Sequence, residues 1–335
     1  MNVMKSTAFT AGARISADLH QFVFDPNAEP ALVIDSGDTV LVETLDCFSN
    51  KITSASELFA TDSDVLAHIG GRYNPVSAPI FVRGAKPGDM IAVEIQDIVV
   101  GARDAKAVTP IAGDWASEFG WEAGLPSPPA ATLVASVNDS MLHIPFEGGM
   151  LTCAPRPMIG TIGTAPAREP ASSLHYGPDH GGNLDCPEVR PGATVFLPVN
   201  VPGALLSLGD VHALMGDGEI TGTALETSAD VTIKVSVTPA QGEIFSPAPR
   251  LDGEDFIGSI GCASTKSVDA NIKSAIADMT HRLVCQSRLS INDAVQIINL
   301  FAKVTVNQSV HLGMNGWTSV LLTVPRPDRL FQVRR

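Results

Sequence analysis

Short segments in which apolar and polar residues alternate recur along most of this chain. The clearest covers residues 230–237, where one face carries Val231, Ile233, Val235 and Val237. Successive side chains of a β-strand point to opposite faces, so a period of two predicts a half-buried strand. The same pattern predicts strands at residues 79–82, 141–145, 204–208 and 319–324.

Some of the strand-like segments form a partial internal repeat. GDTVLVETLD at residues 37–46 aligns with GDMIAVEIQD at residues 88–97, and residues 191–199 form a weaker third copy. A Pro-Gly or Ser-Gly pair followed by alternating apolar residues is typical of a turn that enters a half-buried strand. The repeat therefore favours a mainly β architecture built from hairpins.

Helical periodicity is concentrated near the C-terminus. Residues 267–285 carry apolar side chains at helical spacing, and Ser290 can cap a second helix with Asp293 three residues later. Residues 102–129 are rich in Pro, Gly, Trp and Ala and predict an irregular insertion or lid. Because composition changes sharply nowhere, we expect one intertwined unit over residues 1–335, β-rich over 1–260 and helical over 261–335.

Composition narrows the classes of function. Hydrophobic residues make up 44% of the 335 residues, which allows a sizeable core. The net charge of -14 opposes contact with nucleic-acid phosphates. The five cysteines are odd in number and form no CxxC pair, which indicates reduced thiols in a cytoplasmic protein. Apolar runs fall well short of the ~20 residues of a membrane span, so we expect no membrane association.

The densest polar cluster lies between Asp210 and Glu219 and is flanked by apolar segments. If residues 206–211 continue as a strand, Asp210 and His212 point to the same face. An imidazole and a carboxylate on one face are common ligands of a divalent metal. The further carboxylates Glu219 and Glu226 favour a site, whereas the alternative is a charged hairpin turn at residues 216–218.

A second polar cluster lies upstream at residues 179–185, where His180 and Asp185 bracket Gly-Gly-Asn. Together the two clusters predict one polar site on a β scaffold, although residues 179–185 taken alone also fit a flexible loop. Asp46 closes the first copy of the repeat, and His20 lies further upstream.

Several common catalytic motifs do not occur in the sequence. The serine-hydrolase motif G-x-S-x-G is missing, and so are the Gly-Gly-Ser-Ser-Gly-Gly run of serine amidases and the phosphate-binding G-x-x-x-x-G-K-[ST]. Catalysis by a metal-bound water is therefore the hydrolytic mechanism that the residues leave open.

Four ordered motifs resemble the acetamidase/formamidase family. They are NPVSAPIFVRGAKPGD at residues 74–89, PMIGTIG at 157–163, HGGNLD at 180–185 and GDVHALMGDGE at 209–219. The resemblance covers roughly residues 15–240. It implies a jelly-roll-like β sandwich with intertwined repeats and a few C-terminal helices. It also implies a homo-oligomer that hydrolyses short aliphatic amides to a carboxylate and ammonia with a divalent metal, zinc or calcium.

Placed on the matching positions, the resemblance assigns a role to each candidate residue. The expected metal ligands are His180, Asp185, Asp210 and His212. Glu219 is the expected general base, with His20, Asp46 and Glu226 as orienting groups or alternative ligands.

The substrate and the use of the metal stay open at this point. Met215 or Trp115 would line a small pocket if the substrate has the size of formamide or acetamide. The two alternatives are a non-catalytic metal-binding β protein and a hydrolase of a larger or cyclic amide.

Overall fold

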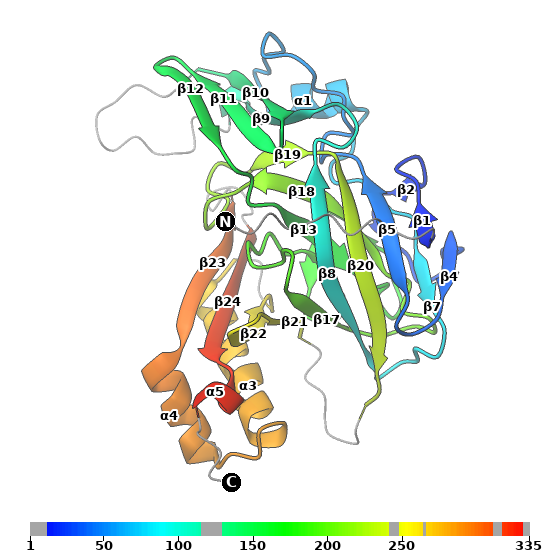
Figure 1. The fold of residues 1–335 in the computed structure, drawn as a ribbon, viewed down its shortest axis with the longest axis vertical. Coiled ribbons are helices and arrows are strands. Elements are labelled where there is room, and N and C mark those ends of the chain that lie inside the picture. The colour runs from blue at the N-terminus through cyan, green and yellow to red at the C-terminus, as the bar shows by residue number, and fades with distance from the viewer. Residues whose placement is uncertain (1–11, 115–128, 241–247, 264–265, 311–316, 331–335) are drawn as a thin grey trace.

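A computed structural model describes residues 12–114, 129–240, 248–263, 266–310 and 317–330, and its architecture is mainly β (Figure 1). Two large sheets, two small two-stranded sheets and a few helices make up the described part of the chain. This confirms the mainly β fold class with helices near the C-terminus.

The first large sheet has nine strands and contains all three copies of the repeat. Its strands in spatial order are β1 (Ala13–Ile15), β5 (Thr39–Thr44), β20 (Ala229–Thr238), β8 (Met90–Val100), β17 (Thr194–Pro198), β21 (Arg250–Asp252), β22 (Phe256–Gly261), β24 (Trp317–Pro325) and β23 (Lys303–Val310). The repeat strands β5 and β8 both pair antiparallel with β20, and the third copy, β17, pairs with the other side of β8. The chain therefore inserts a distant strand between its two clearest repeats.

The second large sheet has eleven strands and carries both polar clusters. Its main path is β12 (Gly149–Cys153), β11 (Met141–Phe146), β10 (Ala131–Asn138), β9 (Lys106–Ile111), β19 (Leu225–Thr227), β18 (Ser207–Leu214), β13 (Met158–Gly163), β16 (Gly181–Asn183) and β15 (Tyr176–Gly177). Off this path, β6 (Val76–Ser77) pairs with β18 and with β2 (His20–Gln21).

The main hydrophobic core lies between the two large sheets. Alternating residues of β20 and β8, such as Val231, Ile233 and Val93, are fully buried with Ile159 and Val211 of the eleven-stranded sheet. Burying such aliphatic side chains contributes about 1.5–3 kcal/mol each. Two small sheets complete the β elements. In one, β4 (Leu32–Ile34) pairs parallel with β7 (Ile80–Val82), and in the other, β14 (Ala171–Ser172) pairs antiparallel with β3 (Val23–Phe24).

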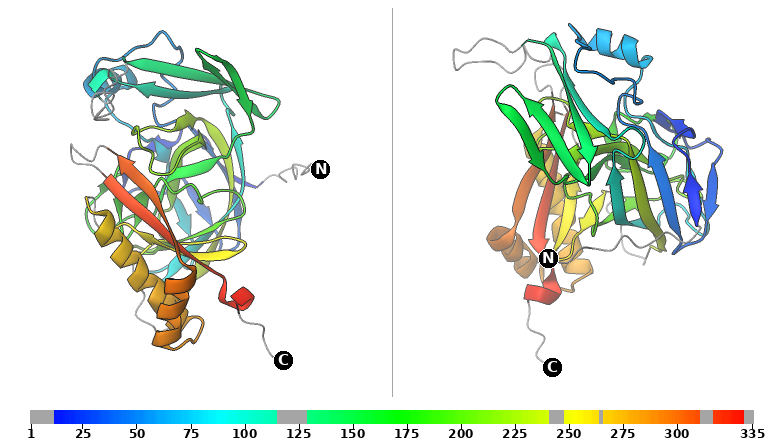
Figure 2. Two further views of the ribbon diagram at one scale, coloured as in Figure 1. Left: turned by 90° about the vertical axis from the view of Figure 1, so that its left-hand side faces the viewer. Right: turned by 45° about the horizontal axis from the view of Figure 1, so that its top comes forward.

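The helices occupy opposite ends of the molecule. Helix α1 (Asp62–Ile69) lies near the β9–β12 strands, whereas α3 (Val268–Cys285), α4 (Ile291–Phe301) and α5 (Pro327–Leu330) gather beside β22 and β24 at the other end (Figures 1 and 2). Ser267 and Ser290 cap α3 and α4 as their side chains accept backbone N–H groups. Both helices start where the sequence pattern predicts.

The insertion predicted at residues 102–129 is partly regular. Its first part contains β9, a strand of the eleven-stranded sheet, and residues 115–128 lie outside the described residues. In the part of the chain that the structure covers, no helix is long and apolar enough to cross a membrane.

Candidate active site

Three neighbouring strands in the middle of the eleven-stranded sheet carry the centre of the site. His212 on β18 lies directly opposite Met158 on β13 and Glu226 on β19. Cross-strand partners on one face have close side chains, so the pairing brings the imidazole against the Glu226 carboxylate. Asp210 lies on the same strand as His212, and the prediction that their side chains meet on one face is confirmed by a 3.4 Å separation.

The His212 imidazole is surrounded by carboxylate oxygens. Its Nε2 lies 3.4 Å from Asp210 Oδ1, 3.4 Å from Glu226 Oε2 and 3.9 Å from Asp185 Oδ1. All four residues are almost fully buried, and neither His212 nitrogen has a hydrogen-bond partner in this structure. Buried polar atoms are nearly always satisfied in proteins, so this arrangement requires a further group.

Asp185 and Glu219 reach the same point from two loops. Asp185 follows β16, and Glu219 lies in the turn that links β18 to β19, where its N–H donates to Gly216. One ligand atom each of Asp185, His212 and Glu219 lie within 4.8 Å of one another. Gln308 on β23 donates a hydrogen bond to Asp185 Oδ2, so the C-terminal part of the chain completes this side of the site.

A small network fixes the Asp210 carboxylate. Its Oδ2 accepts hydrogen bonds of 3.0 Å from the amide of Asn74 and from the hydroxyl of Thr161. The same two side chains also contact Asn183 Oδ1, at 2.9 Å from Asn74 and 2.6 Å from Thr161. Since Oδ2 is held in this way, Oδ1 is the Asp210 oxygen that faces His212.

Gly160 on β13 forms the floor of the cluster. A Cβ at this position would lie 2.6 Å from Asp210 Oδ2, 2.7 Å from Asp185 Oδ1 and 2.8 Å from His212 Nε2. Real Cβ atoms essentially never come this close to other heavy atoms, so only glycine leaves room for the three donors. A strand glycine is thus used here for close approach of functional groups.

The carboxylates perturb one another because they are buried together. Burial raises the pKa of Glu219 and of Glu226 to about 8, and it raises the pKa of Asp185 well above its usual range. Burial alone would lower the pKa of His212. The charges of Glu226 and Asp210 outweigh it and hold the pKa of this imidazole well above its usual range.

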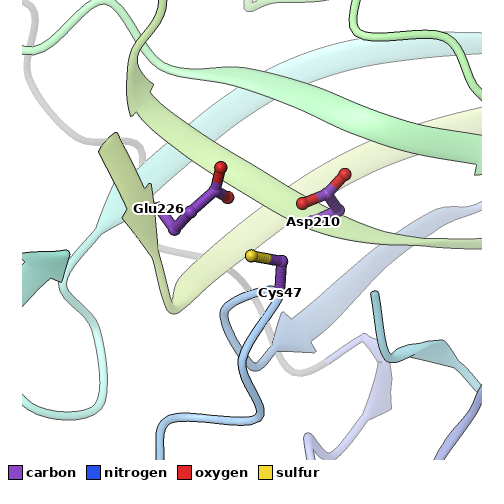
Figure 3. Close-up of side chains that lie close together, drawn as sticks. All are labelled: Cys47, Asp210 and Glu226. Carbon is purple, nitrogen blue, oxygen red and sulfur yellow. The ribbon is translucent and has the colours of Figure 1, made fainter. Parts of the chain in front are cut away.

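Asp185, His212 and Glu219 form a first donor set, and a second donor set of Cys47, Asp210 and Glu226 contains a thiol. Cys47, in the loop after β5, points toward Asp210 and Glu226 (Figure 3), and one ligand atom of each of the three lies within 4.8 Å of the others. The Glu226 carboxylate is oriented by the Ala224 N–H, which donates to Oε1 at 2.8 Å, while buried Oε2 has no hydrogen-bond partner.

The cluster opens into a cavity of about 280 Å³. Apolar and aromatic groups from α1, the loops and β24 line much of it, and Asp210, Glu219 and Glu226 of the cluster also line it. Its apolar and aromatic lining residues are Phe48, Leu66, Tyr73, Leu174 and Trp317. None of the described residues that line this cavity is a lysine or an arginine.

The donor chemistry fits a divalent cation. Four buried carboxyl groups, Asp185, Asp210, Glu219 and Glu226, surround one histidine, and this charge must be offset by protons or by a cation. Two observations favour a cation. The buried atoms His212 Nε2, Asp185 Oδ1 and Glu226 Oε2 have no hydrogen-bond partner, and Gly160 leaves space beside the first two. Imidazole and carboxylate are ligands typical of zinc and similar ions.

Three of the residues predicted for the site lie outside both donor sets. The His180 ring contacts Asp179 at 3.0 Å and the ring of Phe24, and its buried Nε2 has no hydrogen-bond partner. His20 is exposed on β2, with Nδ1 2.9 Å from the carbonyl of Ala17.

Asp46 has a local structural contact instead. Its Oδ1 accepts hydrogen bonds from the backbone N–H groups of Phe48 and Asn50, and it is buried directly before Cys47. Burial raises the pKa of Asp46 to about 7. Of the two residues expected to line the pocket, Met215 packs with Met158 and Ala224, and Trp115 lies outside the described residues.

Sequence reasoning missed several members of the site. The missed residues are Cys47, Asn74, Gly160, Thr161, Asn183 and Gln308, which come from five separate segments. Asn74, Gly160, Thr161 and Asn183 lie inside motifs singled out in the sequence, which was the available signal. Cys47 directly follows the first repeat, whereas no local pattern distinguishes Gln308.

Comparison with known proteins gives one consistent result. The model of the "Acetamidase/Formamidase family" matches residues 16–177 and 129–245. A putative formamidase from Schizosaccharomyces pombe is 29% identical over 262 residues, which are 63% of this chain and 62% of that protein. The chain therefore aligns with slightly less than two thirds of that relative's length.

Two crystal structures are similar over nearly the whole chain. An acetamidase from Bacillus halodurans is 35% identical with a TM-score of 0.79, covering 93% of this chain and 97% of its own. A predicted acetamidase/formamidase from Thermoanaerobacter tengcongensis is 32% identical with a TM-score of 0.79, covering 93% and 95%.

Proposed function

Because this chain belongs to the acetamidase/formamidase family, we propose that it is an amidohydrolase that cleaves the C–N bond of linear amides to a carboxylate and ammonia. The observation that carries the proposal is the convergence of His212 with Asp185, Asp210 and Glu219 beside a cavity that Asp210 and Glu219 line. Such a set can bind a carbonyl, activate water and accept a proton at one place.

A divalent ion fits the donors on one side of this cluster. Asp185, Asp210 and His212 would hold it, because an oxygen of each carboxylate lies within 4 Å of His212 Nε2 and Gly160 leaves space beside all three side chains. When bound, such an ion supplies Lewis-acid polarisation of the amide carbonyl and lowers the pKa of water. Zinc and calcium both remain candidates from the family resemblance.

Glu219 is the proposed general base. Its carboxyl group is buried beside Asp185 and His212, and burial raises its pKa to about 8, which suits proton transfer near neutral pH. It would take a proton from the attacking water and deliver it to the departing nitrogen, so that ammonia leaves as a neutral molecule. The turn from Gly216 to Gly222 holds the Glu219 backbone on both sides.

Other polar residues would position these groups. Asn74 and Thr161 hold one Asp210 oxygen, and Gln308 holds one oxygen of Asp185. Asp46 fixes the loop that carries Cys47. The proposal gives His20 and His180 no part in the chemistry, since they lie outside both donor sets.

The size of the cavity favours an amide larger than formamide or acetamide. A volume of about 280 Å³ with Leu66, Phe48 and Trp317 in its wall accommodates an acyl group larger than formyl or acetyl. An apolar wall stabilises each added methylene by burying it. An amide with a longer or aromatic acyl group is therefore the second candidate substrate. A purely structural metal site is disfavoured because such sites are closed, whereas this cluster borders a cavity.

The test is an ammonia-release assay over formamide, acetamide, butyramide and benzamide, with metal analysis of the same protein. We expect turnover by the wild type and loss of turnover in Glu219→Gln, while Glu219→Asp retains part of it. An exposed carboxylate on β8, Glu94, supplies the control variant Glu94→Gln, which should keep full activity. If no amide is hydrolysed while an ion is bound stoichiometrically, a non-catalytic metal-binding protein becomes the better description.

A further inference from the structure

We propose that Cys47, Asp210 and Glu226 form a thiolate-containing subsite of the metal centre that includes His212. This subsite makes the centre bind a thiophilic divalent ion such as zinc in preference to calcium. The inference deepens the proposed metal-assisted hydrolysis and rests on it for the presence of an ion. It adds a ligand that sequence reasoning did not include and decides between the two candidate metals.

The geometry of the three donors is close to that of a metal site. Their ligand atoms lie within 4.8 Å of one another, and they come from the loop after β5, from β18 and from β19 (Figure 3). In a tetrahedral zinc site, a sulfur at about 2.3 Å and an oxygen at about 2.0 Å from the ion lie roughly 3.5 Å apart. Side-chain movements of about 1 Å or less would therefore close the three donors on an ion.

The two carboxylates each have one oxygen left for this purpose. Asp210 Oδ2 is held by Asn74 and Thr161, and Glu226 Oε1 is held by the Ala224 N–H. Glu226 Oε2 is buried without a hydrogen-bond partner, in a residue that is 1% exposed. An unpaired buried carboxylate oxygen is costly, so its orientation toward Cys47 and His212 suits a ligand of a cation.

The thiol is held in place by the backbone around it. Asp46 accepts the N–H groups of Phe48 and Asn50, and the Asn74 N–H donates to the Cys47 carbonyl at 3.0 Å. Ser49 and Asn50 both adopt a left-handed backbone, with φ of 58° and 56°. Residues in this region carry strain that the surrounding structure must support, and here the strained turn directs Cys47 into the cavity.

The charge around the thiol also favours a cation. Cys47 lies between two carboxylates, and the described residues that line the cavity contain no lysine or arginine to offset them. On binding, the sulfur would give up its proton to solvent and form a bond to the ion, as cysteine ligands do. Thiolate ligands select zinc and similar ions, whereas calcium takes oxygen ligands alone.

Cobalt substitution tests this directly on the full chain. The protein is stripped with a chelator and titrated with Co²⁺, and the near-ultraviolet spectrum is followed for the thiolate-to-cobalt charge-transfer band. We expect an intense band in the wild type and in Cys153→Ser, a control at a half-buried thiol on β12. Cys47→Ser should lose the band. Zn²⁺ should displace Co²⁺, and excess Ca²⁺ should not.

Affinity gives a second measurement. The Zn²⁺ affinity of Cys47→Ser should fall by more than the ~10–100-fold that loss of a merely supporting group costs, while its Ca²⁺ affinity does not fall. Cys47→Ala, checked for folding by circular dichroism, should behave in the same way. The inference is overturned if Co²⁺ binds without the band, if the band persists in Cys47→Ser, if Ca²⁺ displaces Co²⁺, or if the wild type binds no Co²⁺.

Ammonia release, measured on the same preparations, separates this inference from the proposed function. Turnover without the cobalt band would overturn the thiolate subsite and leave amide hydrolysis standing. The cobalt band without turnover of any amide would support the thiolate subsite and overturn amide hydrolysis.

Discussion

Gly160→Ala is the most specific perturbation that the site offers, because it adds a single methyl group at the floor of the donor cluster. The new Cβ would lie 2.6, 2.7 and 2.8 Å from donor atoms of Asp210, Asp185 and His212, whereas ordinary contact begins at 3.4 Å. The three donors must therefore move apart by roughly 0.6–0.8 Å. These side chains are buried and held by Asn74, Thr161 and Gln308, so they cannot simply turn into solvent.

The expected effect is larger on activity than on stability. Overpacking a buried position costs typically about 1–3 kcal/mol. Displacing catalytic groups by about 1 Å can cost ~10²-fold in rate. We therefore expect kcat/KM to fall by about 10- to 100-fold in the ammonia-release assay, with a loss of divalent-ion affinity measured by calorimetry. The chemical denaturation midpoint should shift only as far as the overpacking cost requires.

Gly163→Ala is the matched control on the same strand. Its Cβ would lie 2.8 Å from the carbonyl of His180 and 2.9 Å from the N–H nitrogen of Gly182, which is comparable overpacking away from the carboxylates. It should lose similar stability and keep most of its activity and ion affinity. Gly148→Ala has nothing within 4 Å of the new Cβ and should change neither property. Equal losses of activity in Gly160→Ala and Gly163→Ala would refute the reasoning, and so would wild-type activity in a folded Gly160→Ala.

Three further predictions follow from the site and the packing around it. His212→Ala should abolish stoichiometric metal binding and amidase activity, measured by metal analysis and ammonia release, and full activity without metal would contradict the ligand assignment. Leu66→Trp should fill part of the cavity, so kcat/KM for benzamide should fall by about 10-fold or more while that for acetamide changes less; equal losses would show that Leu66 does not set acyl size. Asp278→Asn should cost about 3–5 kcal/mol in urea unfolding because Asp278 pairs with buried Arg250 at 2.6 Å. In contrast, Asp35→Asn, which removes an exposed pair with Arg83, should cost less than about 1 kcal/mol, and similar values would refute the role of burial.

The regular elements were largely predictable because they depend on local patterns. Alternation over residues 230–237 identifies β20, and Ser267 and Ser290 mark the starts of α3 and α4. The partners of a strand are set by long-range packing, which a local pattern does not encode. The insertion of β20 between β5 and β8 is therefore invisible in the repeat itself.

The site was predictable only as far as its residues share a strand or a motif. Asp210 and His212 are two residues apart on β18, so the period of a strand is enough to predict that they meet. Gln308 contacts Asp185, which is 123 residues away in the sequence. Cys47 approaches Glu226 from the loop after β5, a strand of the nine-stranded sheet. His180 shows the converse limit, since a place in the right motif does not bring its ring into either donor set.

Three carboxylates of the cluster share an unusual backbone conformation. Asp185, Asp210 and Glu219 each adopt a left-handed backbone, with φ of 44°, 56° and 42°. For residues other than glycine this costs on the order of 1 kcal/mol or more each. At Asp210 the left-handed conformation interrupts an otherwise extended strand, although the two-residue spacing already places its side chain on the face of His212. Strained backbone of this kind tends to gather at functional sites, and here it recurs at three carboxylates of one cluster.

This strain separates the conformational role of Asp210 from its charge. Asn tolerates the left-handed region about as well as Asp, so Asp210→Asn should keep the fold and lose the ligand. Asp210→Ala would lose the ligand and also lack the side chain that favours this conformation, so it should be less stable than Asp210→Asn in urea unfolding. If the two variants unfold at the same urea concentration, the backbone at this position is not strained, and Asp210 contributes to the site through its charge alone.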